Sequence, residues 1–149
     1  MSKVSTQIVT PEDLISGVLV NRQNGQFVDA SVHFAKEFRF MDHGVGLEFK
    51  DRARLAEFFY KVREFYPDSS LITNRVFTSG DHVILEWTYR ATITEPFCGG
   101  HSLKVPISVQ GASVVQTHEG EISEWADYYD GLKSRRTALA AYFQDGPEL

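Results

Sequence analysis

The stretch from 118 to 130, His-Glu-Gly-Glu-Ile-Ser-Glu-Trp-Ala-Asp-Tyr-Tyr-Asp, decides the fold that the sequence predicts. It opens with a polar turn whose glycine can take the positive φ that a tight hairpin needs. The residues after the turn are predicted to form a strand, and in a regular strand Ser123, Trp125, Asp127 and Tyr129 share one face. A face that carries an indole, a carboxylate and a phenol is typical of the wall of a half-polar cavity.

The composition predicts one folded domain over residues 1–149, because 42% of the residues are hydrophobic and 13% are aromatic. The net charge of −5 argues against nucleic acid as a partner, since phosphate backbones are bound by basic surfaces. No apolar run approaches the roughly 20 residues of a membrane span. The N-terminus also lacks the apolar segment of a signal peptide, so we expect a cytoplasmic protein that does not contact membranes.

Apolar spacing and end signals predict helices first and strands afterwards. Thr10 can cap the first helix, and Pro11 suits its first turn. The expected helices cover about 11–23, 27–35, 51–66 and 132–143, and the expected strands cover about 38–42, 71–78, 82–94, 105–117 and 121–130. This order predicts an α+β fold in which a long, curved antiparallel sheet packs against the N-terminal helices and encloses a pocket.

The order of elements resembles the cone-shaped fold of nuclear transport factor two and its enzyme relatives. Residues 40–46, Phe-Met-Asp-His-Gly-Val-Gly, precede an amphipathic helix and are similar to the strand-Asp-loop of ketosteroid isomerases. Residues 65–68, Phe-Tyr-Pro-Asp, resemble the SnoaL-like polyketide cyclases, and residues 119–130 resemble the last strand of SnoaL-like proteins and of limonene-epoxide hydrolases. The resemblance covers about residues 11–132 and implies a cone-shaped domain that forms a homodimer.

Two enzyme classes within this resemblance lack their partner residues here. Asp42 matches the proton-shuttling carboxylate of the ketosteroid isomerases, but their oxyanion-stabilising tyrosine and acid would fall near Val18 and Ala112. Asp127 matches one acid of the epoxide hydrolases, whose arginine and second aspartate would fall near two aromatic residues of the 82–94 strand. The resemblance is therefore strongest to the SnoaL-like class.

Asp127 and Asp42 are the first two candidate catalytic residues. A carboxylate beside Trp125 and across from Trp87 or Tyr89 would be partly desolvated, which raises its pKa and suits it to proton transfer near neutral pH. The alternative for Asp127 is a hydrogen bond to a loop or exposure to solvent. The alternative for Asp42 is a turn residue that steadies the glycine loop after it.

His43 is the third catalytic candidate, although in a strand it would point away from Asp42, and a lone histidine is usually found on the surface or in satisfied packing. Aromatic residues near the two acids are expected to bind the substrate. These residues are Phe40, Trp87, Tyr89, Trp125 and Tyr129. The five histidines show no metal-ligand spacing, so neither a metal nor another cofactor is expected.

The resemblance and the two acids together predict an enzyme that uses acid–base chemistry without a cofactor. Its expected partner is a small, apolar, oxygenated ring compound, such as a polyketide or terpenoid intermediate. The expected reaction is an isomerisation, a cyclisation, or the addition or loss of water. Two alternatives stay open: a non-catalytic protein that binds a small ligand or serves as a dimeric scaffold, and an epoxide hydrolase with a rearranged site.

Overall fold

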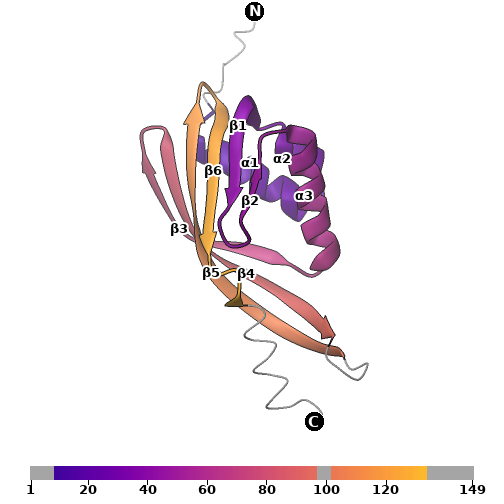
Figure 1. The fold of residues 1–149 in the computed structure, drawn as a ribbon. Helices are drawn as coiled ribbons and strands as arrows, with labels where there is room; N and C mark the ends of the chain where they lie inside the picture. Colours follow the sequence, from indigo (N-terminus) through magenta and orange to yellow (C-terminus); the bar gives the residue numbers. More distant parts are fainter. Residues whose placement is uncertain (1–8, 97–101, 134–149) are drawn as a thin grey trace, which may run out of the picture.

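The computed structural model of the chain describes residues 9–96 and 102–133. The helices are α1 (Pro11–Gln23), α2 (Phe27–Ser31) and α3 (Arg52–Phe65). The strands are β1 (Phe34–Asp42), β2 (Leu47–Phe49), β3 (Ser70–Ser79), β4 (His82–Pro96), β5 (Ser102–His118) and β6 (Glu121–Tyr129). Within the described residues, three helices gather on one side of a strongly curved sheet, and the long hairpin of β4 and β5 extends beyond them (Figure 1). The α+β architecture with N-terminal helices and a curved sheet is thereby confirmed.

In the described part of the chain the sheet has six strands, in the order β2-β1-β6-β5-β4-β3. All neighbouring strands are antiparallel except β1 and β6, which run parallel. This parallel pair joins an early and a late segment of the chain and aligns Asp42 with Asp127. The two candidate acids therefore lie on neighbouring strands, whose backbones are about 5 Å apart.

The helix ends follow the predicted capping chemistry. Thr10 and Asp13 form a reciprocal capping box at the start of α1, with hydrogen bonds of 3.1 and 3.2 Å. Asp51 caps α3 by accepting a 3.0 Å hydrogen bond from the backbone of Arg54. No helix in the described part of the chain is long and apolar enough to cross a membrane.

One predicted helix end is wrong, and one short strand was missed. The second helix ends at Ser31 and not near residue 35, because Phe34 begins β1, pairs with Ile122 and packs against Phe38 with ring centroids 5.1 Å apart. This tertiary pairing overrides the local helical pattern. The three-residue strand β2 was not predicted. Beyond residue 133 the helix expected over 132–143 lies outside the described residues.

A bulge in β6 changes the face that Ser123 occupies. Gln116 pairs with Glu124 while Thr117 pairs with Ile122, so Ser123 is the extra residue. Its hydroxyl donates a 3.1 Å hydrogen bond to the Gln116 carbonyl oxygen. The prediction that Ser123 shares the face of Trp125 is therefore wrong.

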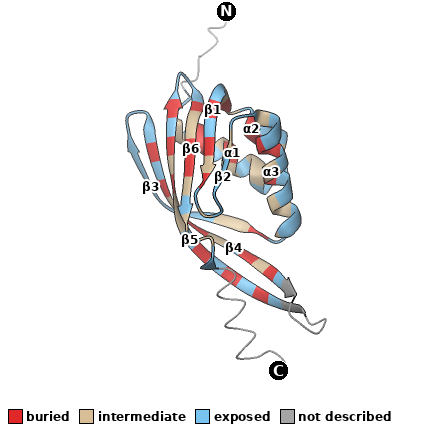
Figure 2. Ribbon diagram, viewed as in Figure 1, coloured by how far each residue is buried: buried red, intermediate tan, exposed pale blue. Residues whose placement is uncertain are grey.

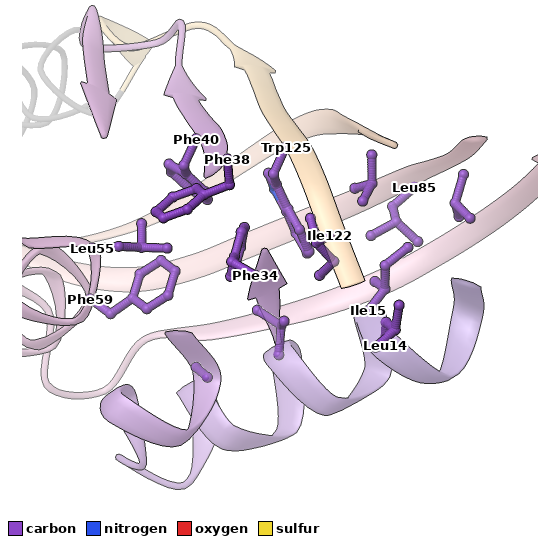
Figure 3. Close-up of a cluster of buried hydrophobic side chains, with 14 of the residues drawn as sticks. Leu14, Ile15, Phe34, Phe38, Phe40, Leu55, Phe59, Leu85, Ile122 and Trp125 are labelled. Atoms are coloured by element: carbon purple, nitrogen blue, oxygen red, sulfur yellow. The ribbon is translucent and has the colours of Figure 1, made fainter. Parts of the chain in front are cut away.

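The main core joins buried side chains of α1, α2 and α3 with those of β1, β4, β5 and β6. Figure 2 shows buried positions on the strands beside the helices and also along the β4–β5 hairpin beyond them. Aromatic rings and leucine side chains from β1, β6 and α3 meet there (Figure 3). Phe40 packs against Phe59 with ring centroids 5.6 Å apart and stacks on Trp125 at 6.2 Å. This packing fixes β1 and β6 against the helices, so that their last residues lie at a cavity beyond the core.

Candidate functional site

A cavity of about 190 Å³ lies between the helices and the sheet, next to the aromatic core. Helices α1 and α3 contribute one side, and strands β4, β5 and β6 contribute the other. The cavity is mostly apolar but is lined by three carboxyl residues, one arginine and three tyrosines. These residues are Asp42, Asp127, Asp130, Arg22, Tyr66, Tyr89 and Tyr129.

Asp127 is fixed by two hydrogen bonds that both reach Oδ1. The Ser113 hydroxyl donates one at 2.5 Å, and the Trp125 indole donates the other at 2.7 Å. The Ser113 oxygen in turn accepts a 2.8 Å hydrogen bond from the Trp87 indole. Oδ2 of Asp127 makes no hydrogen bond to any residue that the structure describes. One oxygen is therefore held in place, and the other is left for a ligand.

Burial is the main cause that raises the pKa of Asp127 above its ordinary value. The hydrogen bond from Ser113, the charge of Arg22 and the hydrogen bond from Trp125 each lower it, in decreasing order, without reversing the shift. A buried carboxyl group that holds its proton to higher pH can both give and take a proton near neutrality. This is the pKa shift that the sequence predicted for Asp127.

The stability of the protein is expected to depend on pH through Asp127. Between the ordinary carboxyl pKa of about 4 and the raised value, the folded protein holds a proton that the unfolded chain has lost. The contribution of Asp127 to the free energy of unfolding therefore falls as the pH rises through this interval. Urea unfolding at a series of pH values should show this fall in the native chain but not in Asp127→Asn.

Asp29→Asn is the matched control for that measurement, because Asp29 lies exposed on α2. It should keep the slope of the native chain. A difference between the native chain and Asp127→Asn that stays flat or rises with pH over this interval would contradict the assignment.

Asp42 lies beside Asp127 but is engaged by the protein itself. Its Oδ1 accepts hydrogen bonds from the backbone of Gly44 at 3.0 Å and Val45 at 3.1 Å. Its Oδ2 accepts a 2.9 Å hydrogen bond from the Tyr129 hydroxyl. The turn role considered for Asp42 from the sequence is therefore present, and Asp42 also positions the Tyr129 phenol at the cavity. Burial and Asp42 raise the pKa of Tyr129.

The aromatic residues expected to bind substrate divide into two groups. Trp87, Tyr89 and Tyr129 line the cavity. Trp87 lies over Gly111, where an added Cβ would come within 2.4 Å of its ring. Phe40 and Trp125 are 0% and 1% exposed and belong to the core behind the cavity. Trp125 reaches the site through its indole nitrogen, whereas Phe40 does not line it.

His43 lies away from the cavity. Its backbone donates a 2.9 Å hydrogen bond to the Asp127 carbonyl, which continues the β1–β6 ladder. Its exposed ring stacks on Tyr128 with centroids 4.5 Å apart, on the opposite face of the sheet from Asp42. The structure does not bring His43 to the two acids.

Arg22 is the charged cavity residue of the helices that the sequence interpretation missed, and Tyr66 was missed as well. Arg22 lies in the last turn of α1, with its guanidinium carbon 4.2 Å from the centroid of the Phe59 ring. The sequence contained a hint of this role. Val18 aligns with the tyrosine of the ketosteroid isomerases, and Arg22 lies one helical turn after Val18 on the same face of α1. The two candidate acids line the same cavity, and their negative charges raise the pKa of Arg22 against the larger effect of burial.

No cluster of three metal-ligating side chains occurs among the residues that the structure describes. The chemistry visible in this cavity is that of carboxyl groups, phenols and a guanidinium.

The model of the SnoaL-like polyketide cyclases matches residues 18–137. The chain belongs to this family. The match includes Arg22, both acids and the aromatic residues of the cavity. No curated protein matched the chain.

The chain is also similar to solved structures that have the same fold. One is a protein with a ketosteroid isomerase-like fold from Catenulispora acidiphila, solved with trimethylamine (18% identity, TM-score 0.74, 87% of this chain and 95% of that chain). A candidate SnoaL-like polyketide cyclase from Jannaschia sp. CCS1 has 16% identity and a TM-score of 0.71 over 94% of this chain and 99% of that chain. An epoxide hydrolase from M. tuberculosis of the limonene-epoxide-hydrolase-like kind has 17% identity and a TM-score of 0.67 over 90% and 95%. At these identities the similarity establishes the fold.

Proposed function

We propose that this SnoaL-like protein is an acid–base enzyme that acts on an apolar, oxygenated ring compound without a cofactor. The observation that carries the proposal is the Asp127 carboxyl group, which is held at Oδ1, left without a protein partner at Oδ2 among the described residues, and shifted to a higher pKa inside the cavity. Removal of a proton next to a carbonyl group, and its return elsewhere, is the step that isomerisation, cyclisation and loss of water share.

Tyr129 is the best-placed second group for this chemistry. Its hydroxyl lines the cavity and is anchored by Asp42, so Asp42 acts through the phenol. Trp87 offers an apolar ring surface on the same side of the cavity. A flat ring between these groups would present its polar substituent to Asp127 and Tyr129.

Deuterium exchange tests proton transfer before the natural substrate is known. We expect the protein to accelerate the uptake of deuterium at the carbon next to the carbonyl group of 2-tetralone, followed by proton NMR in heavy water near neutral pH. Tetralone suits the cavity because it combines an aromatic ring with a ketone. An exchange rate equal to that in buffer, although tetralone binds, would favour the non-catalytic ligand-binding alternative.

The epoxide hydrolase alternative has one observation in its favour. Arg22, Asp42 and Asp127 line the same cavity, so this cavity contains the guanidinium and the two carboxyl groups that an epoxide hydrolase uses. In this chain the arginine comes from α1 and the second aspartate from β1, whereas the resemblance predicted both on the 82–94 strand. Release of a diol from cyclohexene oxide, measured by gas chromatography, would support this chemistry. Its absence in a protein that exchanges deuterium into tetralone would favour the first proposal.

The homodimer stays a prediction. The outer face of β3 and β4 exposes Ile72, Phe77 and Ile84, which are 46%, 51% and 42% exposed, and Phe77 pairs with Ile84 on neighbouring strands. We propose that a second copy covers this apolar surface. Light scattering coupled to gel filtration should give twice the monomer mass, and a monomer mass would contradict the proposal.

A further inference from the structure

Arg22 carries a guanidinium at the cavity that has no direct hydrogen-bond or ion-pair partner among the described residues, although the charges of Asp127 and Asp42 act on it. Its guanidinium stacks on Phe59 at 4.2 Å, and it makes no hydrogen bond or ion pair with any residue that the structure describes. Burial lowers the pKa of Arg22, and the charge of Asp127 opposes this change. Arginine nevertheless stays protonated in proteins. A partly buried cation therefore faces the cavity with its donors unused.

Tyr89 presents a second unused polar group beside Arg22. Its hydroxyl is buried and has no hydrogen-bond partner within residues 9–96 and 102–133. Ser69 lies close by, but without the geometry of a hydrogen bond. A buried hydroxyl without a hydrogen-bond partner destabilises the fold, so such a group in a native protein requires an explanation, such as a bound ligand. Arg22 and Tyr89 line the same two cavities, and the charge of Arg22 lowers the pKa of the Tyr89 phenol against the larger effect of burial.

The two sides of the Arg22–Tyr89 pair differ in polarity, and this difference would set the orientation of a bound molecule. Both residues line a second cavity of about 360 Å³, which carries the polar side chains of Ser16, Gln23 and Arg63. On the other side, the first cavity offers the Trp87 ring. A molecule with an anionic end and an apolar ring would place its anion at the junction of the two cavities and its ring against the aromatic side.

We propose that Arg22 and Tyr89 bind the carboxylate of the ligand, so that the natural ligand is an organic acid with an apolar ring. The planar guanidinium can donate two parallel hydrogen bonds to a carboxylate, and the Tyr89 hydroxyl can donate a third. The carboxylate would give the Arg22 guanidinium a direct acceptor for its hydrogen bonds, and it would also accept the hydrogen bond of the buried Tyr89 hydroxyl. This inference names the substrate class for the proposed function and rests on the same cavity, but it does not require Asp127 to transfer a proton.

Paired probes that differ in charge test the inference. Benzoate and benzamide have the same ring and nearly the same shape, and their dissociation constants can be measured by isothermal titration calorimetry. The fluorescence of Trp87, at the cavity, provides a second readout. We expect the native protein to bind benzoate at least about tenfold more tightly than benzamide. Equal affinities, or no binding of benzoate, would overturn the proposal.

Substitutions of Arg22 and Tyr89 test whether these two residues cause the preference for benzoate over benzamide. Arg22→Gln should remove the preference for benzoate while leaving the affinity for benzamide nearly unchanged. Tyr89→Phe should weaken benzoate binding by about two- to tenfold, as expected for one lost hydrogen bond. Arg54→Gln is the matched control, since it removes the same charge from an exposed position on α3 and should bind like the native protein. A preference that survives in Arg22→Gln would overturn the proposal.

The proposal stays testable where Arg22→Gln does not fold. Arg22→Lys keeps the charge but replaces the planar fork with a single ammonium group, so it should retain a reduced preference for benzoate. A full native preference in this variant would contradict recognition by the guanidinium fork. Because the readout is binding, a failure here is distinct from a failure of deuterium exchange, which would count against proton transfer by Asp127 alone.

Discussion

Phe40→Ala is expected to lower the free energy of unfolding by about 3–5 kcal/mol, the usual loss when a buried phenylalanine is truncated. The Phe40 side chain is 0% exposed and lies among the rings of Phe34, Phe59 and Trp125. These rings come from β1, α3 and β6, so a void at Phe40 loosens the contact between the helices and both strands that carry the candidate acids. Urea unfolding followed by circular dichroism measures the loss.

Phe65→Ala provides the comparison for Phe40→Ala. Phe65 is also a phenylalanine, at the end of α3, but it is 75% exposed. Its truncation should change stability by less than about 0.5 kcal/mol. A loss below 1 kcal/mol for Phe40→Ala would show that Phe40 is not a core residue, and would return it to the substrate-binding role that the sequence suggested.

Asp127→Asn is expected to reduce the rate of catalysed deuterium exchange by about 10²–10⁴-fold, the usual contribution of a general acid or base. The substitution suits the site unusually well, because both protein hydrogen bonds to Asp127 reach the single atom Oδ1. The carbonyl oxygen of asparagine can accept both bonds from Ser113 and Trp125. The amide nitrogen then replaces the oxygen that we assign to proton transfer, and it cannot take a proton.

The measurement compares initial exchange rates into 2-tetralone for the native protein, Asp127→Asn and Asp29→Asn. Asp29→Asn makes the same chemical change at an exposed position of α2 and should keep the native rate. Unfolding curves of all three proteins establish that differences in rate do not follow from differences in folding. An Asp127→Asn protein that exchanges deuterium at the native rate would remove Asp127 from the mechanism.

The sequence predicts those parts of the fold that depend on local chemistry. The Thr10 cap and the glycine turn before β6 have their expected geometry, with a φ of 78° at Gly120. The positions of Phe40 and Asp42 on one face of β1 also follow from alternation, and both are buried. These features depend on neighbours within a few residues, which a single sequence displays.

The parts that could not be predicted depend on contacts between distant segments. Ile122 and Trp125 are both buried because Ser123 bulges out, and nothing in the local pattern distinguishes this bulge from regular alternation. Phe34 joins a strand because a partner strand arrives from the other end of the chain. Arg22 resembles an ordinary basic residue at the end of a helix, and only the assembled cavity gives it a role.

The parallel pairing of β1 with β6 sets the order in which the candidate site can be assembled. Asp42 and Tyr129, which meet in the site, are 87 positions apart in the chain. Contacts of such large separation form slowly, since a long loop must close before they contribute. During synthesis on a ribosome, β1 and β2 would be complete long before β6 emerges. Until then one edge of β1 would have no strand partner, and Phe40 would lack its contact with Trp125. We therefore expect the nascent chain to depend on protection against aggregation until its last strand is made, and the site to be the last part of the protein to form.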